Sequence, residues 1–475
     1  MMKRFHFIIS ALLILTSLFS CKKALETKGH SFLSPNTFYT NEADANAALN
    51  GAYANLFSQD MYGRAVWLIS DLPADLYYIT LNNADRVSIF QGTFTATNGV
   101  VRDWWLANYL VIKNANDVIA YVPGIDMDED RKNNIVGNAR FLRGLCYFNL
   151  AEAFGDVPVL LTPGIDSLFP SRSPVAAVYA QIIEDLKYAE ENCLHIAELP
   201  EQEIGRATSE AASGLLAKVY LQKSSTGAAE SSDHSNALAL CNKVISYSNS
   251  HPDYLALEET FGNIFNPDTK NGKEILFNVQ FGAPPNASNI INMGFQPIAK
   301  GGFGSYSGLD FHYNSYKPDD IIRRTVNIGN IEGSARKISK YDDDGVPPGV
   351  FGRNNWIVLR YADILLMQSE AQHGVDPSGT AKFAGINAVR SRAGIGALDF
   401  TNTPTADDFI TALVNERCWE FCIEGQRRWD LLRLNRYKEV LQAVGRPFND
   451  LHMKYYPIPQ TEIDVNPNLV QTQGF

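Results

Sequence analysis

The most regular hydrophobic pattern in the chain lies between Asn138 and Pro158. Small and apolar residues recur there every three or four positions on one helical face: Ala139, Leu142, Cys146, Asn149 and Ala153. A second face carries Phe141, Leu145, Phe148 and Glu152. Two packing faces are typical of a helix inside a helical stack. We therefore expect a long helix that ends at Gly155, with Pro158 preventing its continuation.

The same spacing recurs along much of the chain and predicts a mostly α-helical protein. The further expected helices cover 41–57, 102–122, 172–192, 206–222, 233–247, 356–372, 380–392 and 406–424. A single run, 274–281, is predicted to be a strand. Gly144 and Gly214 are separated by close to two tetratricopeptide periods of about 34 residues each. The pattern favours stacked helical hairpins, a tetratricopeptide-like scaffold with a few short strands.

Three long segments break the helical pattern: 60–99, 282–318 and 342–355. They are rich in Gly, Asn, Pro and aromatic residues, and long loops in a compact protein are usually functional or disordered. The tail, 455–469, is predicted to be extended and interrupted by Pro. We expect these irregular insertions to form a binding face on the helical scaffold.

The N-terminus has the layout of a bacterial secretory signal. Two basic residues precede an almost wholly apolar run that is short for a membrane span. Ser20 is followed by Cys21, and a small residue before a cysteine at this position resembles a lipobox. We expect residues 1–20 to be removed, Cys21 to carry lipid and 21–40 to act as a tether. The alternative is an ordinary secreted protein with an incidental cysteine.

Apolar content, net charge and the cysteines exclude several classes of protein. The chain has 475 residues, 45% of them apolar, which is enough for a large core. The net charge is −11, and loss of Lys3 and Arg4 with the signal leaves 39 basic against 52 acidic residues, or −13. This acidic balance argues against nucleic-acid binding. The cysteines after Cys21 form no CxxC or Cys/His cluster, so we expect buried core residues and no zinc site or disulfide framework.

Clustered carboxylates raise the question of catalysis. The segment 416–428 places three glutamates on one predicted helix face among arginines: Glu416, Glu420, Glu424, Arg417, Arg427 and Arg428. Paired carboxylates can act as general acid and base in glycoside cleavage. Among arginines, however, they would be charged and paired, which is the wrong state for a proton donor. We therefore expect a structural ion-pair network and no enzyme activity.

Two acidic runs resemble parts of calcium-binding loops. The run 126–130 begins like an EF-hand, but Arg131 and Gly137 stand where that loop needs Gly and Glu. A negatively charged helix start is the expected structure. The run 342–344 predicts a solvated turn, with calcium binding left open. We expect no metal and no cofactor.

Several motifs, in this order along the chain, resemble those of one known family. They are W-x-x-x-Y-x-x-I-x-x-A-N (105–116), R-F-L-R-G-x-x-Y-F (140–148), L-R-Y-A-D-I-L-L (359–366), E-R-x-x-E-F-x-x-E-G-x-R-R-W-D-L (416–431) and P-I-P (457–459). Together with the lipobox, they are similar to the SusD/RagB family, whose members are nutrient-binding lipoproteins on the outer surface of Bacteroidota-type cells. The resemblance runs from end to end of the chain.

The resemblance implies an organisation and a function. The expected parts are an N-terminal SusD-like helical region, 41–250, and a C-terminal SusD/RagB region, 251–475, packed as one globular unit. The protein would be anchored by lipid to the outer membrane, facing the exterior, and would deliver an oligosaccharide to a SusC-like TonB-dependent transporter. Three alternatives stay open: the same scaffold binding peptides, a surface glycosidase, and an adaptor that binds protein.

The two aromatic-rich irregular segments, 61–94 and 281–316, form the predicted binding site. Sugars present flat C–H faces and hydroxyl groups, which call for aromatic platforms and hydrogen-bonding side chains. The residues chosen for their rings or donor forks, and not by alignment, are Trp67, Tyr78, Arg86, Phe303, Tyr306 and Tyr313. For each aromatic residue the alternative is a buried anchor of its loop.

Overall fold

The computed structural model describes residues 35–164, 168–282, 287–332, 335–447 and 453–475. It divides into Met1–Thr40, of which the short helix α2 (Pro35–Phe38) is described, and the large unit Asn41–Phe475. The predicted signal sequence and Cys21 lie outside the described residues. The core and the pockets belong to the large unit.

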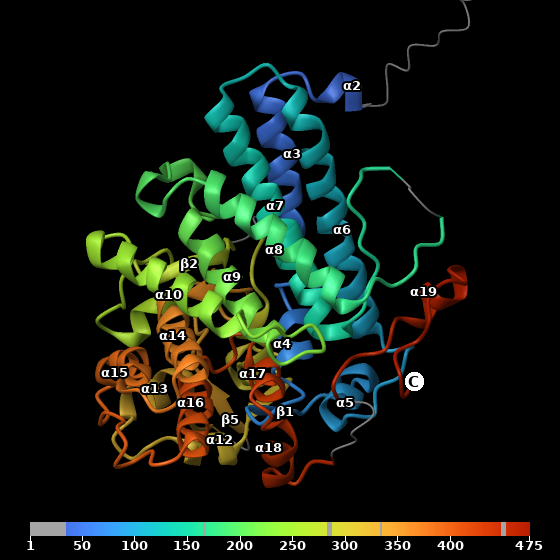
Figure 1. Cartoon of the computed structure of the whole chain (residues 1–475). Helices are drawn as coiled ribbons and strands as arrows, with labels where there is room; N and C mark the ends of the chain where they lie inside the picture. The colour runs from blue at the N-terminus through green and yellow to red at the C-terminus, as the bar shows by residue number, and fades with distance from the viewer. Residues whose placement is uncertain (1–34, 165–167, 283–286, 333–334, 448–452) are drawn as a thin grey trace, which may run out of the picture. The chain divides into compact units, whose positions relative to one another are not determined.

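The large unit is mostly α-helical, as the sequence predicts (Figure 1). Its longer helices are α3 (Glu42–Ala54), α6 (Gly99–Tyr121), α7 (Glu129–Phe154), α8 (Val175–Asn192), α9 (Ser209–Lys223), α10 (Asp233–Ser250), α14 (Tyr361–Val375), α15 (Phe383–Arg392) and α16 (Ala406–Glu420). From α6 onward each of these helices packs against the next, α6 on α7, α7 on α8 and so on to α16. This tetratricopeptide-like stacking confirms the predicted fold class.

Helix α7 lies at the centre of the stack and contacts α3, α6, α8 and α9. It begins earlier than predicted, because the Asp128 carboxylate accepts a hydrogen bond from the Arg131 backbone N–H at 3.0 Å and caps the helix. The acidic run is therefore a helix start, as expected. The helix ends at Gly155, whose φ is 71°. Gly144 permits the close approach of α8, since a Cβ there would lie 3.1 Å from Leu186.

Within the described residues, short antiparallel sheets complete the fold. They pair β1 (Tyr77–Ile79) with β3 (Tyr306–Gly308), β2 (Ile275–Val279) with β6 (Trp356–Arg360), and β4 (Ile328–Glu332) with β5 (Ala335–Ile338). Strand β2 confirms the predicted strand. The prediction of one helix over 356–372 is wrong at its start, because β6 is aromatic and β-branched and pairs with the buried β2. Helix α14 begins only at Tyr361.

Short helices occupy segments that the sequence leaves irregular or unassigned. They are α4 (Ala65–Ser70), α5 (Ala84–Gln91), α11 (Ile291–Phe295), α12 (Asp310–Ser315), α13 (Ile321–Asn327), α17 (Arg427–Arg433), α18 (Tyr437–Ala443) and α19 (Gln460–Val465). Helix α19 interrupts the tail that the sequence predicts to be extended. Helices of one or two turns contain too few apolar positions for a period to identify them.

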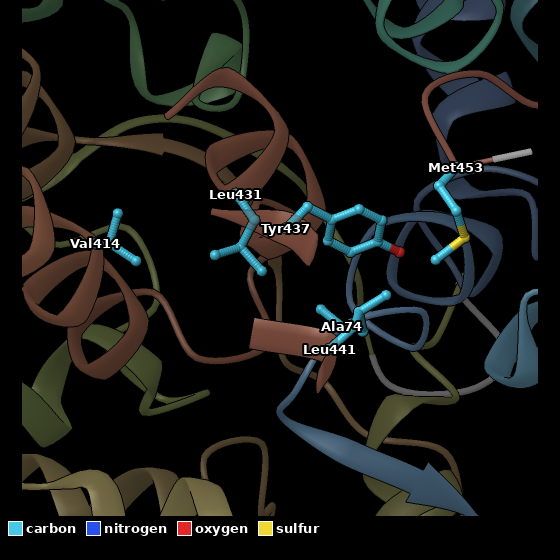
Figure 2. Packing of buried hydrophobic residues seen from close by; sticks show 6 residues of the cluster. All are labelled: Ala74, Val414, Leu431, Tyr437, Leu441 and Met453. Carbon is cyan, nitrogen blue, oxygen red and sulfur yellow. The ribbon is translucent and has the colours of Figure 1, made fainter. Parts of the chain in front are cut away.

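The C-terminal helices α16, α17 and α18 enclose a cluster of apolar side chains. Figure 2 shows its six buried side chains: Ala74, Val414, Leu431, Tyr437, Leu441 and Met453. The Tyr437 hydroxyl donates a hydrogen bond to the Pro73 carbonyl at 2.9 Å. The chain between α4 and β1 is thereby fixed against helices that lie far away in the sequence.

A buried ion-pair network centres on Arg360, the last residue of β6. Its guanidinium nitrogens lie 2.5 Å from a carboxylate oxygen of Glu420, 2.7 Å from Glu274 and 2.8 Å from Glu424. Glu420 also pairs with Arg392. The side chains of Arg360 and its three glutamates are wholly buried. The clustered carboxylates are therefore paired with arginine, as expected.

The network differs from the predicted arrangement in two ways. Helix α16 ends at Glu420, so Glu424 lies in the following turn and not on the same helix face. The arginines that pair with the glutamates come from other elements, as Arg360 of β6 does. Arg417, which is next to Glu416 in sequence, pairs instead with Asp363 at 2.9 Å. Sequence spacing cannot show such pairing, because the partners meet only in the folded chain.

Replacing Glu420 with Gln should lower the free energy of unfolding by about 3–5 kcal/mol, because buried guanidinium groups lose their counter-charge. Burial raises the pKa of Glu420, but Arg392, Arg360 and Arg323 outweigh it and hold the pKa below its ordinary value. The stabilisation is therefore present above the unfolded-state pKa of about 4.3 and is lost as the pH falls through the folded-state pKa. Denaturant titration of both proteins at several pH values measures the difference.

The matched control is Glu439→Gln. Glu439 is 73% exposed, and its carboxylate lies 3.9 Å from Arg436. Its replacement should change the free energy of unfolding by less than about 0.5 kcal/mol. Equal effects of the two substitutions would contradict a stabilising role for the buried network.

Candidate ligand-binding pocket

The two aromatic-rich segments meet at the sheet formed by β1 and β3. The ladder aligns Tyr78 with Ser307. Just beyond it, the Thr80 backbone N–H donates a hydrogen bond to the Ser305 carbonyl at 2.9 Å. The segments from which we expect the binding site are therefore held side by side by backbone hydrogen bonds.

A pocket of about 440 Å³ opens beside this sheet. Its lining is mostly apolar and is formed by Arg64, Trp67, Leu81, Arg86, Ile290, Gly294, Ile298, Gly302, Phe303, Ser305 and Tyr306. Four of the six residues predicted to contact the ligand are among them: Trp67, Arg86, Phe303 and Tyr306. A concave, largely apolar lining with a few polar groups is typical of small-molecule sites.

The rim of the pocket exposes apolar side chains to solvent. Phe303 is 46% exposed, Leu81 46% and Ile298 75%. The Phe303 backbone N–H donates a hydrogen bond to the Met293 carbonyl at 2.7 Å, which fixes the loop that presents the ring. Exposed apolar residues gathered at a concavity mark a binding surface. Phe303 is therefore the pocket aromatic whose ring is open to a ligand.

Trp67 and Tyr306, which the sequence predicts to be open platforms, are instead packed into the wall of the pocket. They are 1% and 3% exposed, and their ring centroids are 4.9 Å apart in an edge-to-face arrangement. Phe295 and Tyr77 complete this aromatic cluster, with centroids 5.0 Å apart. Burial raises the pKa of Tyr306, whose hydroxyl accepts a hydrogen bond from Arg86 at 3.1 Å. The cluster gives the pocket a rigid wall.

Tyr78 and Tyr313 do not line the pocket. Tyr78 lies next to the buried Tyr77 on β1, and successive side chains of a strand point to opposite faces. Tyr313 belongs to α12, where the Arg336 guanidinium lies 3.8 Å from its ring centroid. Both rings are half-buried in the protein.

The sequence does not identify the other seven residues of the pocket lining, among them Arg64, Leu81 and Ile298. Leu81 and Ile298 are isolated aliphatic residues in loop runs, T-L-N-N and P-I-A-K, a signal that could have identified them. Arg64 gives no comparable signal. It directly precedes α4, and only the fold brings it to the wall that holds Arg86.

The described residues offer neither a metal site nor a membrane-spanning helix. No group of three or more His, Cys, Asp or Glu among them is placed to hold a metal ion. In the acidic run 342–344, Asp343 is not solvated as expected but pairs with Arg353 at 2.7 Å. None of the described helices is both long and apolar enough to cross a bilayer. The described cysteines are unpaired and buried, as expected: Cys146, Cys193, Cys241, Cys418 and Cys422.

Family models match the sequence at both ends. The model described as "SusD family" matches residues 329–475, and the model described as "Starch-binding associating with outer membrane" matches residues 25–221. SusD-like protein P25 of Formosa agariphila is 27% identical over an alignment of 537 positions, which covers 98% of this chain and 98% of that protein.

Solved structures share the fold over nearly the whole chain. A laminarin binding SusD-like protein has a TM-score of 0.77 at 24% identity, over 92% of this chain and 100% of its own. Surface glycan-binding protein A from Bacteroides fluxus has a TM-score of 0.78 at 22% identity, again over 92% and 100%. The family assignment agrees with the expectation of a binding protein without catalytic activity. Motifs, family models and fold together identify the chain as a SusD-like protein of the SusD/RagB family.

Proposed function

We propose that this protein binds an oligosaccharide at the outer surface of the cell and delivers it to a SusC-like TonB-dependent outer-membrane transporter. The observation that carries the proposal is the pocket beside the β1–β3 sheet, with the exposed ring of Phe303 at its rim and Arg64 and Arg86 on its wall. The protein would bind and release its ligand without breaking a bond.

The side chains of the pocket suit the chemistry of a sugar. A sugar ring offers an apolar C–H face, on which Phe303 can stack, and a hydroxyl edge, to which Arg64 and Arg86 can donate hydrogen bonds. The buried cluster around Trp67 holds the wall in place before the ligand arrives. Such preorganisation lowers the conformational entropy lost on binding.

The similar proteins support a glycan as the ligand. One solved structure is of a laminarin binding protein and another of a surface glycan-binding protein, and one matching family model is described as starch-binding and associated with the outer membrane. A peptide is the alternative ligand, and the same binding screen includes it.

Phe303→Ala should weaken binding of the oligosaccharide roughly five- to tenfold, since an aromatic contact contributes on the order of 1 kcal/mol. The measurement is calorimetric titration with the tightest ligand from a screen of oligosaccharides and peptides. The matched control is Phe311→Ala, because Phe311 is 41% exposed and lies outside the pocket. Unchanged affinity in Phe303→Ala would place the site elsewhere, and binding of peptides alone would replace the glycan as ligand.

Trp67→Ala should lower the free energy of unfolding by about 3–5 kcal/mol, because the indole is 1% exposed and packed among other rings. Thermal unfolding of the two variants separates the roles of the aromatic residues. Trp67→Ala should melt well below wild type, and Phe303→Ala should melt close to it. A Trp67→Ala protein with unaltered melting but weakened binding would make Trp67 a ligand contact.

We infer that the lipid anchor is attached at Cys21. Cys21→Ala should release the protein from the membrane fraction or leave the signal uncleaved, which immunoblotting of fractionated cells detects. Ser20→Ala is the matched control, since it keeps a small residue before the cysteine and should leave the anchor intact. A Cys21→Ala protein that still fractionates with the outer membrane would rule the anchor out.

A further inference from the structure

Two arginine side chains line the pocket, and the part of the chain that the structure describes contributes no carboxylate to its lining. Arg64 directly precedes α4 and Arg86 is the third residue of α5, and the fold brings both to the pocket. Among the described residues of the lining there is no Asp or Glu. The pocket is therefore a locally positive concavity in a protein whose net charge is −11.

Neither guanidinium group is neutralised by a close carboxylate in the described part of the chain. Arg64 lies 3.9 Å from Asp60, and the two side chains are 27% and 49% exposed. A partly exposed pair at this distance contributes little. Arg86 donates a hydrogen bond to the neutral hydroxyl of Tyr306 at 3.1 Å. Both groups can therefore engage an anion without first breaking a strong ion pair.

Arginines in the interior of the same protein have close carboxylate partners. Arg143 donates two hydrogen bonds to Asp185, at 2.8 and 2.7 Å. Arg427 donates two to Asp75, at 2.8 and 2.9 Å. Such two-point pairs are the strong form of the arginine–carboxylate interaction. The fold supplies a two-point carboxylate partner at these positions, whereas the described residues provide Arg64 with one distant carboxylate and Arg86 with a neutral hydroxyl.

The electrostatics of the pocket favour an incoming anion. Burial lowers the pKa of Arg64, and the positive charge of Arg86 lowers it further. An anion placed between the two groups would relieve this repulsion, and the planar guanidinium can hold carboxylate or sulfate oxygens through two parallel N–H donors. The negative charge on the rest of the protein opposes anion binding only weakly, because salt screens exposed charges beyond a Debye length of about 8 Å.

We propose that the pocket selects an anionic oligosaccharide, whose carboxylate or sulfate groups bind Arg64 and Arg86 while Phe303 stacks on a sugar face. This inference rests on the proposed function and narrows its ligand class. A neutral glycan would offer both guanidinium groups only hydroxyl oxygens in place of water, and so would gain less from them.

The test titrates probes of equal length into the full mature protein at low and high salt. The probes are a neutral β-glucan oligosaccharide, an oligogalacturonate and a sulfated galactan oligosaccharide. We expect one or both acidic probes to bind about tenfold more tightly than the neutral probe, and their binding to weaken as salt rises. Binding of the oligogalacturonate alone assigns carboxylate as the recognised group, and binding of the sulfated probe alone assigns sulfate.

Variants assign the selectivity to the two arginines. Arg64→Gln and Arg86→Gln should each lower the affinity for the acidic probe about tenfold, and should lower the affinity for the neutral probe by a clearly smaller factor, because that probe loses only hydrogen bonds to its hydroxyl groups. Arg86→Lys keeps the charge but loses the planar fork, and should retain more affinity than Arg86→Gln. The matched control is Lys243→Gln, which removes one positive charge from the surface of α10, outside the pocket, and should leave all affinities unchanged.

The outcomes separate this inference from the proposed function. Equal affinity for neutral and acidic probes would overturn the inference and leave oligosaccharide binding intact. Acidic binding that neither Arg64→Gln nor Arg86→Gln weakens would also overturn it, because the anion would then be held elsewhere. If no oligosaccharide of either class binds to the folded protein, the proposed function fails together with the inference.

Discussion

The buried guanidinium of Arg360 joins the end of β6 to two parts of the chain that are distant from it in sequence. It binds Glu274 just before β2, Glu420 at the end of α16 and Glu424 in the turn that follows. Charges withdrawn from water are tolerated only where each has its partner, and the loss of one partner leaves another charge unpaired. The strand pair and the end of α16 therefore have one satisfactory mutual arrangement, and the surrounding structure depends on it.

The turn after α16 connects the ion-pair network to the helix that lines the pocket. Ile423 has a φ of 55°, which is rare for a β-branched residue and is held by its surroundings. Asp71 accepts hydrogen bonds from the backbone N–H groups of Gly425 and Arg427, at 2.8 and 3.1 Å. Because Asp71 directly follows α4, the helix that contains Trp67, the ion-pair network and the wall of the pocket are linked through consecutive contacts.

The sequence predicts structural features that rest on a repeated or local pattern. It does not predict features that depend on residues distant in sequence. The α7 helix was predictable because its two apolar faces persist over many turns, whereas α4 and α11 are too short to show a period. The aromatic-rich segments indicated the region of the pocket. Which aromatic residue is open was not predictable: Trp67 is 1% exposed and Phe303 46%, because burial depends on the segment packed against each ring. The partners of the buried glutamates were hidden for the same reason.

The backbone pairing of β1 with β3 has a consequence for how this protein can evolve. The sheet holds the pocket together without using the side chains at its rim, Leu81, Ile298 and Phe303, which project from loops outside the helical stack. Mutations at the rim can change the shape and polarity of the pocket while the core of the fold keeps its stability. The pocket can therefore diverge in shape between related proteins without loss of the fold that holds it.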